Sequence, residues 1–176
     1  MEYLNPAGWP RPRGYNHGVA AAGRLVFVAG QIGCDATGTL VAGGLVEQVR
    51  QAIANCLAVL AEAGAGPEHA VRMTWFVADR ASYVAERPAI GEVYRELMGA
   101  SYPAMSLYEV GLLEPGALVE IELTAVMPLQ QARSGRRHAG RAFAHTAART
   151  TRGAGGGKLR RRIDTLYRRW SAQSSS

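Results

Sequence analysis

The amino-acid composition changes abruptly after Leu129, and this change limits the part of the chain that can fold. Residues 1–129 contain eight Arg, no Lys and thirteen Asp or Glu, a formal charge of −5. Residues 130–176 contain eleven Arg, one Lys and a single acid, Asp164, a formal charge of +11. This second segment is rich in Gly, Ala and Ser, a composition typical of linkers and disordered extensions. The sequence therefore predicts one folded domain over residues 1–129 and a basic, disordered tail over residues 130–176.

Composition also argues against several classes of protein. Two cysteines, Cys34 and Cys56, are too few for a disulfide scaffold of this size. No apolar run reaches the length of a transmembrane helix, and the acidic N-terminus lacks the apolar segment of a secretory signal. Without Lys, the domain offers no Schiff-base or phosphate-loop lysine. We expect a cytoplasmic protein with no metal and no other cofactor, since no cluster of His, Cys and acids has metal-ligand spacing.

Hydrophobic periodicity predicts two helices and several strands. Runs rich in β-branched and apolar residues predict strands at residues 24–29, 71–77, 105–110 and 118–126. We expect residues 17–22 to pair with the first of these strands through a turn. Apolar residues at three- and four-residue steps predict one helix from about residue 46 to Gly64, with Gln48 on its polar face, and a second from about Pro88 to Gly99. Two helices packed on one sheet form an α+β fold.

The last predicted strand alternates between apolar and polar residues. Its apolar positions run from Val119 to Ala125 in steps of two, and the other face carries Glu120, Glu122 and Thr124. This polar face must meet water or line an interface. A polar-lined junction between subunits suits it better than the closed core of a monomer.

Four segments, in this order, resemble one protein family. They read LVFVAGQIG at residues 25–33, VRQAIANCL at 49–57, PAMSLYEV at 103–110 and LVEIE at 118–122. Over roughly residues 14–128 the chain resembles the RidA/YjgF family of reactive-intermediate (enamine/imine) deaminases. The resemblance implies a chorismate-mutase-like α+β subunit, with two helices packed on one face of its sheet, that forms a homotrimer with clefts between subunits. It also implies hydrolysis of imines, tautomers of enamines released by pyridoxal-phosphate enzymes, to ketones and ammonia.

The resemblance also implies the residues of a candidate site. Glu120 matches the carboxylate that positions and deprotonates water, and Tyr15 matches an aromatic hydroxyl at the mouth of the cleft. Backbone groups that bind the substrate are expected at Gly30, Gln31 and Ala104. From periodicity alone, Glu120 has a second interpretation as a solvated strand residue beside Glu122.

The chain departs from the family at several substrate-binding positions. The Arg that binds the substrate carboxylate is replaced by Met105, and loss of such a charge-assisted pair removes about 1.5–3 kcal/mol of binding. Other departures are Ala29 in place of Ser, Gly91 in place of Asn and Leu107 in place of Cys. The pocket is therefore expected to be more apolar. Arg13 is either a replacement for the missing Arg or a solvated residue, and His17 is either a site residue or a surface histidine.

Three functions are open from the sequence. The first is a RidA-like hydrolytic deaminase whose imine, enamine or ketone ligand lacks the usual carboxylate, or rests a larger apolar group on Met105 and Leu107. The second is a non-catalytic small-molecule-binding member of the family, since the Arg, Ser and Asn positions are all lost. The third is RNA binding or ribonuclease-type activity through the basic tail, because the −5 charge of the domain disfavours phosphate contacts.

The tail contains one periodic segment. Its apolar residues fall on one helical stripe flanked by Arg, at Leu159, Ile163, Leu166, Tyr167 and Trp170. This pattern is typical of a basic amphipathic helix that makes weak electrostatic contact with nucleic acid or anionic membrane. The other interpretation is a solvated, disordered extension, because a helix this short is marginal alone.

Overall fold

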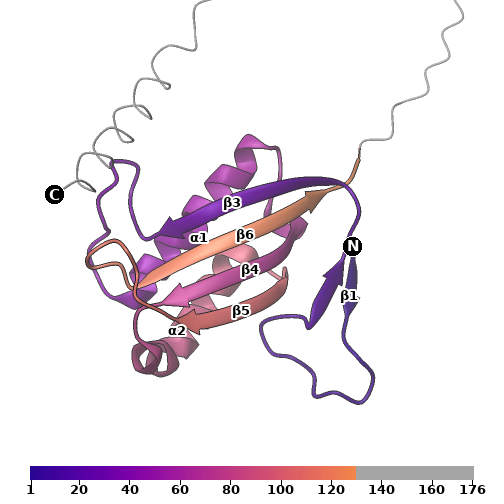
Figure 1. Cartoon of the computed structure of the whole chain (residues 1–176), viewed down its shortest axis with the longest axis horizontal. Helices are drawn as coiled ribbons and strands as arrows, with labels where there is room; N and C mark the ends of the chain where they lie inside the picture. The colour runs from indigo at the N-terminus through magenta and orange to yellow at the C-terminus, as the bar shows by residue number, and fades with distance from the viewer. Residues whose placement is uncertain (130–176) are drawn as a thin grey trace, which may run out of the picture. The chain divides into compact units, whose positions relative to one another are not determined.

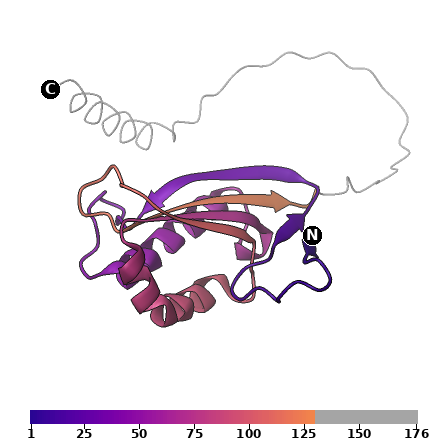
Figure 2. The same cartoon turned by 60° about the horizontal axis from the view of Figure 1, so that its bottom comes forward.

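Two helices cover one face of a four-stranded sheet in the computed structural model, which describes residues 1–129 (Figures 1 and 2). In chain order the elements are β1 Glu2–Leu4, β2 Gly18–Ala20, β3 Arg24–Ile32, α1 Leu45–Glu62, the 3-10 turn Pro67–His69, β4 Ala70–Val77, α2 Arg80–Met98, β5 Ala104–Glu109 and β6 Val119–Met127. The predicted α+β fold, with both helices on one face, is confirmed. The tail predicted over residues 130–176 lies outside the described residues.

The strand order of the main sheet is β3-β6-β4-β5. The central strand β6 is antiparallel to both β3 and β4, whereas β4 and β5 are parallel. Parallel neighbours need a crossover connection, and α2 provides it. The strand β5 is therefore an edge strand of the main sheet, joined to β4 through α2.

The core lies between the helices and the sheet. On α1, side chains with no exposed surface include Val49, Ile53 and Cys56, and on β6 they include Val119 and Ile121. The predicted alternation of the last strand is therefore confirmed, with its apolar face toward the helices. Among residues 1–129, neither helix has the length and apolar character needed to cross a membrane.

Gln48 is part of this core, and its predicted place on the polar face of α1 is wrong. The side chain is 4% exposed. Its amide nitrogen donates to the Gly116 carbonyl at 3.0 Å, and its amide oxygen accepts from the Leu118 N–H at 2.8 Å. These two bonds satisfy the buried amide and hold the loop that leads into β6.

The second helix begins at Arg80, so its predicted start near Pro88 is wrong. Asp79 caps it by accepting a hydrogen bond from the Ser82 N–H at 2.6 Å. Pro88 stands inside the helix, where it cannot donate to a carbonyl one turn earlier. The additional turns bring the ring of Tyr83 to 6.5 Å from that of Trp75, so packing helps to stabilise a helix that the proline weakens.

The N-terminal segment runs past the sheet, and the predicted pairing of residues 17–22 with β3 is wrong. Instead β2 pairs with β1 in a separate two-stranded sheet. The Asn16 N–H donates to the Pro103 carbonyl at 3.1 Å, and its side-chain amide donates to the Tyr102 carbonyl at 2.5 Å. These bonds fasten the segment at the start of β5, and the chain then crosses the end of the sheet to reach β3 (Figure 1).

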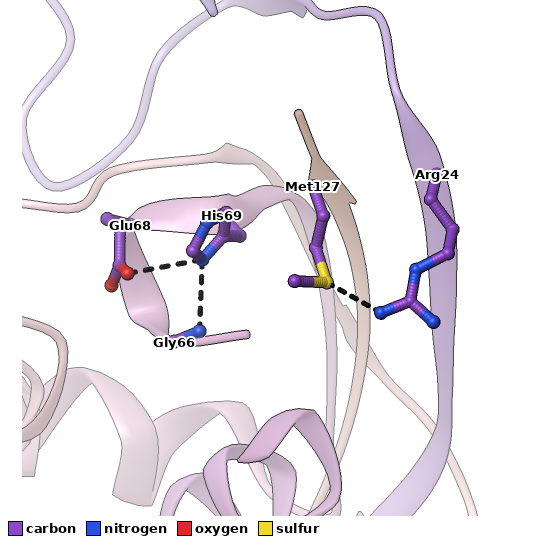
Figure 3. A network of polar contacts seen from close by, with 5 residues as sticks. All are labelled: Arg24, Gly66, Glu68, His69 and Met127. Atoms are coloured by element: carbon purple, nitrogen blue, oxygen red, sulfur yellow. Dashed lines mark hydrogen bonds and ion pairs between the residues drawn. The ribbon is translucent and has the colours of Figure 1, made fainter. Parts of the chain in front are cut away.

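Polar contacts lie near the end of α1, at the turn before β4 and between β3 and β6 (Figure 3). The His69 Nδ1 accepts from the Gly66 N–H at 3.0 Å, which closes the turn before β4. The Arg24 guanidinium donates to the Met127 Sδ at 3.0 Å and to the carbonyl at the C-cap of α1 at 2.6 Å. A cation is favourable at a helix C-terminus, so Arg24 ties the start of β3 to α1 and to the end of β6.

Candidate functional site

A cleft of about 590 Å³ opens between α2, the edge strand β5 and the N-terminal segment. We call it the α2 cleft. Its α2 wall consists of Tyr83, Arg87, Ile90, Gly91, Tyr94 and Arg95. Its remaining lining residues are Arg13, Gly14, Tyr15, Trp75, Tyr102, Met105, Ser106 and Leu107. Four positions taken from the family resemblance, Tyr15, Gly91, Met105 and Leu107, thus line one cleft.

The docked N-terminal segment brings Tyr15 into the wall of the cleft. The bonds of Asn16 to the start of β5 fix the segment one residue further along. His17 does not line the α2 cleft. Its ring instead packs edge-on between Trp9, at 5.1 Å, and Tyr15, at 5.5 Å.

The strand register places Met105 and Leu107 on the helix side of β5. Met105 lies opposite Met73 of β4, and Leu107 lies opposite Trp75. Both β4 residues are buried in the core, and both β5 residues are half-buried against it. Met105 and Leu107 therefore make the β5 wall of this cleft mostly apolar, and Ser106 is the polar β5 residue in its lining.

Aromatic rings form the floor of the α2 cleft. The rings of Tyr94 and Tyr102 stack at 5.7 Å, and Tyr94 lies 6.4 Å from Trp75. The Tyr94 hydroxyl donates to the Ser101 carbonyl at 2.7 Å. Burial raises the pKa of Tyr94 well above that of an exposed tyrosine, so the hydroxyl stays protonated at neutral pH. The indole Nε1 of Trp75 is buried with no hydrogen-bond partner among the described residues.

The charged residues around the α2 cleft are all cationic. Arg13 comes from the N-terminal segment, and Arg87 and Arg95 come from α2. None of the described residues that line the cleft is acidic. The cleft therefore combines an apolar floor with a positive rim.

Glu120 lies elsewhere, on the face of the sheet that the helices leave uncovered. It sits opposite Ile32 of β3 and Phe76 of β4, beside an irregularity in the β3–β6 pairing between Val28 and Gln31. Gly30 is at this irregularity, and a Cβ built on it would come 2.7 Å from the Glu120 Cδ and overlap the carboxylate. The carboxylate can lie against β3 because position 30 has no side chain.

The other predicted backbone positions surround Glu120 or lie at the edge of the sheet. The Gln31 side-chain amide folds back to donate to the Ala29 and Gly30 carbonyls, at 3.1 and 3.2 Å. Ala104 begins β5 and bridges to Asn16, outside the lining of the α2 cleft. Ala29, Gly30, Gln31 and Glu120 thus form a second cluster, which we call the Glu120 cluster.

One chain does not bring the two clusters together. Val119 and Ile121 are buried toward the helices, so Glu120 between them points to the opposite face of the sheet. The α2 cleft opens on the helix side, and β4 separates β6 from β5. Tyr15 and Glu120 therefore belong to different surfaces of the same subunit.

Several cleft residues are not predicted from the sequence, and three of them, Tyr83, Arg87 and Arg95, lie on α2. They share a signal, because positions 83, 87, 91 and 95 follow one another at four-residue steps and lie on one helical face. A predicted helix start near Pro88 hides this pattern, since it leaves Tyr83 and Arg87 in a loop. Within residues 1–129, no group of three His, Cys, Asp or Glu side chains is arranged to hold a metal ion.

Comparisons with known proteins cover the whole of this region. The family model described as Endoribonuclease L-PSP matches residues 10–127, which include every residue of both clusters. A RutC family protein of Synechocystis is 41% identical over 131 residues, 73% of this chain and 98% of the relative. The 2-iminobutanoate/2-iminopropanoate deaminase of Capra hircus is 38% identical over 104 residues, 58% of this chain and 73% of the relative.

A solved structure extends the similarity to the fold. The protein of unknown function from the conserved Rid protein family of Yersinia pestis is 35% identical to this chain. It superposes with a TM-score of 0.65 over 72% of this chain and 98% of its own.

Proposed function

The chain belongs to the RidA/YjgF family, whose matching model is described as Endoribonuclease L-PSP, and from this premise we propose that it hydrolyses reactive enamine or imine intermediates to ketone and ammonia. The observation that carries the proposal is the placement of Tyr15, Gly91, Met105 and Leu107 around one cleft, with Glu120 held by Gly30 on a second surface. Relatives named as 2-iminobutanoate/2-iminopropanoate deaminases support the same chemistry.

The proposed reaction needs one water and one base. Glu120 accepts a proton from water as the water oxygen bonds to the imine carbon, and it returns this proton to the nitrogen, which receives the C=N electron pair. The resulting amino alcohol transfers its hydroxyl proton to nitrogen, the C–N bond breaks, and ketone and ammonia leave. The Tyr15 hydroxyl and the backbone at Gly30 and Gln31 orient the substrate.

We propose that a homotrimer completes this site. The α2 cleft of one subunit and the Glu120 cluster of another would then face each other across the subunit junction. Two observations support an interface on the uncovered sheet face. Phe27 of β3 is 72% exposed there, and the rings of Phe76 of β4 and Tyr108 of β5 stack at 6.2 Å on the other side of β6 on the same face.

The apolar residues of the β5 wall limit the kind of substrate that the cleft can bind. Met105 replaces the clamp of the family, so the substrate lacks the usual carboxylate or rests a large apolar group on Met105 and Leu107. The aromatic floor of Tyr94 and Tyr102 favours the second arrangement, because it supplies a matching surface for a ring or a long aliphatic chain.

The test is ammonia release from imines generated in place, measured against the oxidase alone. An amino-acid oxidase supplies carboxylate-bearing imines from leucine, methionine and phenylalanine, and an amine oxidase supplies neutral ones. We expect the full chain to accelerate release and Glu120→Gln to lower the acceleration about 10²- to 10⁴-fold. Glu122→Gln is the matched control, since Glu122 lies two residues along the same face of β6 and is exposed.

Equal inactivity of the wild type and Glu120→Gln on every imine would overturn the deaminase proposal. A ligand that raises Tm without being converted would then favour the non-catalytic binding function. That alternative draws on the loss of the Arg, Ser and Asn positions at Met105, Ala29 and Gly91.

RNA binding or cleavage is a further alternative, motivated by the description of the family model and by the +11 charge of residues 130–176. Binding that depends on these residues should weaken steeply with salt and vanish on truncation after Leu129. Equal binding by the truncated and full-length chains at low salt would assign no role to the tail.

A further inference from the structure

We propose that Arg87 and Arg95, on either side of Gly91 in α2, form the anion-binding element of the α2 cleft. The chain would then take an imino acid with an aromatic or large aliphatic group, and would hold its carboxylate from the helix instead of from β5. This inference rests on the proposed function, and it makes α2 the part of the fold that determines specificity.

The two arginines lie on the same face of α2, on either side of Gly91. Arg87 and Arg95 each stand four residues from Gly91, about 6 Å along the axis, so the two arginines are about 12 Å apart along the helix and only their long side chains can bring both guanidinium groups toward one ligand. All three line the α2 cleft. Gly91 leaves the space between the arginines open, and a Cβ built there would come 3.4 Å from the Arg95 Nη1.

The arginines have no internal counter-ion. Among residues 1–129, no carboxylate lies within 4.0 Å of Arg87 or Arg95. The contrast is Arg50 of α1, which pairs with Glu96 at 2.7 Å and with Glu47 at 3.9 Å. The neighbouring Glu96 of α2 is thus engaged by Arg50, while the two cleft arginines keep their donors available for a ligand.

The charge of Arg87 also acts within the cleft. Burial raises the pKa of the Tyr83 hydroxyl, and the positive charge of Arg87 opposes this rise. Arg87 therefore lies close to Tyr83, whose ring packs on Trp75 beside the surface where the apolar part of a ligand would lie.

The size and surface of the cleft indicate the rest of the ligand. A volume of about 590 Å³ is within the range of pockets that enclose drug-sized molecules. Trp75, Tyr94 and Tyr102 offer flat faces, and Met105 adds an adaptable wall. An anion beside a ring or long chain matches this combination better than a two- or three-carbon imino acid.

The experiment measures binding to the full chain by titration calorimetry, with phenylpyruvate as the anionic probe and phenylacetone as the neutral one. The variants are Arg87→Gln, Arg95→Gln and the double variant. Arg80→Gln is the matched control, because Arg80 lies on the exposed first turn of α2 and does not line the cleft.

We expect phenylpyruvate to bind the wild type at least tenfold more tightly than phenylacetone, by a margin that shrinks with added salt. The double variant should lose about ten- to a hundredfold for phenylpyruvate while its affinity for phenylacetone stays unchanged. The unchanged neutral probe also shows that the cleft remains folded. Arg80→Gln should behave as the wild type.

Unchanged phenylpyruvate affinity in the double variant would overturn the inference. So would a loss produced by Arg13→Gln alone, which would assign the anion site to the N-terminal segment. Because the readout is binding, its failure is distinct from failure of the deaminase: arginine-dependent binding without ammonia release contradicts the proposed reaction and leaves the anion site in place.

Discussion

The α2 cleft and the Glu120 cluster differ in how much of each is built by a single chain. The cleft is bounded on several sides, by α2, β5 and the N-terminal segment, and it has an aromatic floor and a cationic rim. Glu120 lies on an uncovered sheet face with strongly exposed apolar residues such as Phe27. Under the proposed function, one subunit therefore supplies the whole binding cleft, whereas the reaction centre requires a second subunit. Binding and turnover should therefore respond to different substitutions.

Gly30→Ala should have the largest effect, because it should lower turnover at the Glu120 cluster without changing binding in the α2 cleft. A methyl group at this position would overlap the Glu120 carboxylate and displace it. We expect ammonia release to fall about a hundredfold, because a displacement near 1 Å costs that much in positioning. Phenylacetone binding in the α2 cleft should stay unchanged in the same protein.

Gly111→Ala serves as the control for Gly30→Ala, since a Cβ at Gly111 meets no atom within 4 Å. If Gly30→Ala retains full turnover, Glu120 does not act from its position in this structure. The assignment of turnover to the Glu120 cluster would then be wrong.

Phe27→Asp should test whether the uncovered sheet face is an interface. Phe27 is exposed, so the substitution should leave the unfolding free energy of one subunit nearly unchanged. A charge buried at an interface should weaken assembly by about 2 kcal/mol or more per contact, roughly 30-fold in the dissociation constant. Light scattering should give a smaller mass for this variant than for the wild type.

Leu113→Asp is the comparison for Phe27→Asp, because Leu113 is 84% exposed in the loop between β5 and β6. Assembly that is equally sensitive at both positions would argue that the sheet face has no special role. A monomeric wild type would remove the proposed interface site altogether.

The sequence predicts some parts of the fold and of the candidate site better than others. Local periodicity is sufficient for the extent of α1 and for the alternating strand that carries Glu120, because their apolar residues recur at the period of a helix and of a strand. Periodicity does not predict the burial of Gln48, because its partners, Gly116 and Leu118, are about 70 residues away and make a polar residue compatible with the core. Helical periodicity alone does not predict such long-range hydrogen bonds.

The cleft was predicted less completely than the Glu120 cluster. The family resemblance gave Tyr15, Gly91, Met105 and Leu107, yet the roles assigned to them stay predictions. Pro88 favours a helix start, which places Tyr83 and Arg87 in a loop, whereas the cap at Asp79 begins the helix more than two turns earlier. A proline inside a helix is unfavourable locally, and the fold tolerates it here through packing that only the tertiary structure shows.

Tyr94→Phe should lower the free energy of unfolding, because Tyr94 belongs both to the floor of the α2 cleft and to the core. Loss of the hydrogen bond to the Ser101 carbonyl should lower the free energy of unfolding by about 1 kcal/mol at neutral pH. Since burial raises the Tyr94 pKa, the unfolded chain loses this proton first as pH rises above about 10. The contribution of Tyr94 to stability is therefore complete below pH 10 and is lost in more alkaline solution.

Urea unfolding at pH 8 and pH 10.5 measures this difference. The wild type should lose more stability between the two pH values than Tyr94→Phe, since the variant has no proton to release at this position. Parallel losses in the two proteins would show that the Tyr94 hydroxyl is not held in a buried, protonated state.

Gly91→Ala should produce the smallest effect, with opposite signs for stability and binding. Alanine in the interior of α2 should raise the free energy of unfolding by about 0.5–1 kcal/mol, because glycine loses more conformational freedom on folding. The new methyl group would sit 3.4 Å from the Arg95 Nη1, in van der Waals contact with it, and would fill part of the gap between the two arginines. We expect phenylpyruvate affinity to fall about threefold, below the loss from removing an arginine, with phenylacetone unaffected. A variant that is more stable and binds both probes as the wild type does would show that the gap between Arg87 and Arg95 contributes to helix flexibility alone.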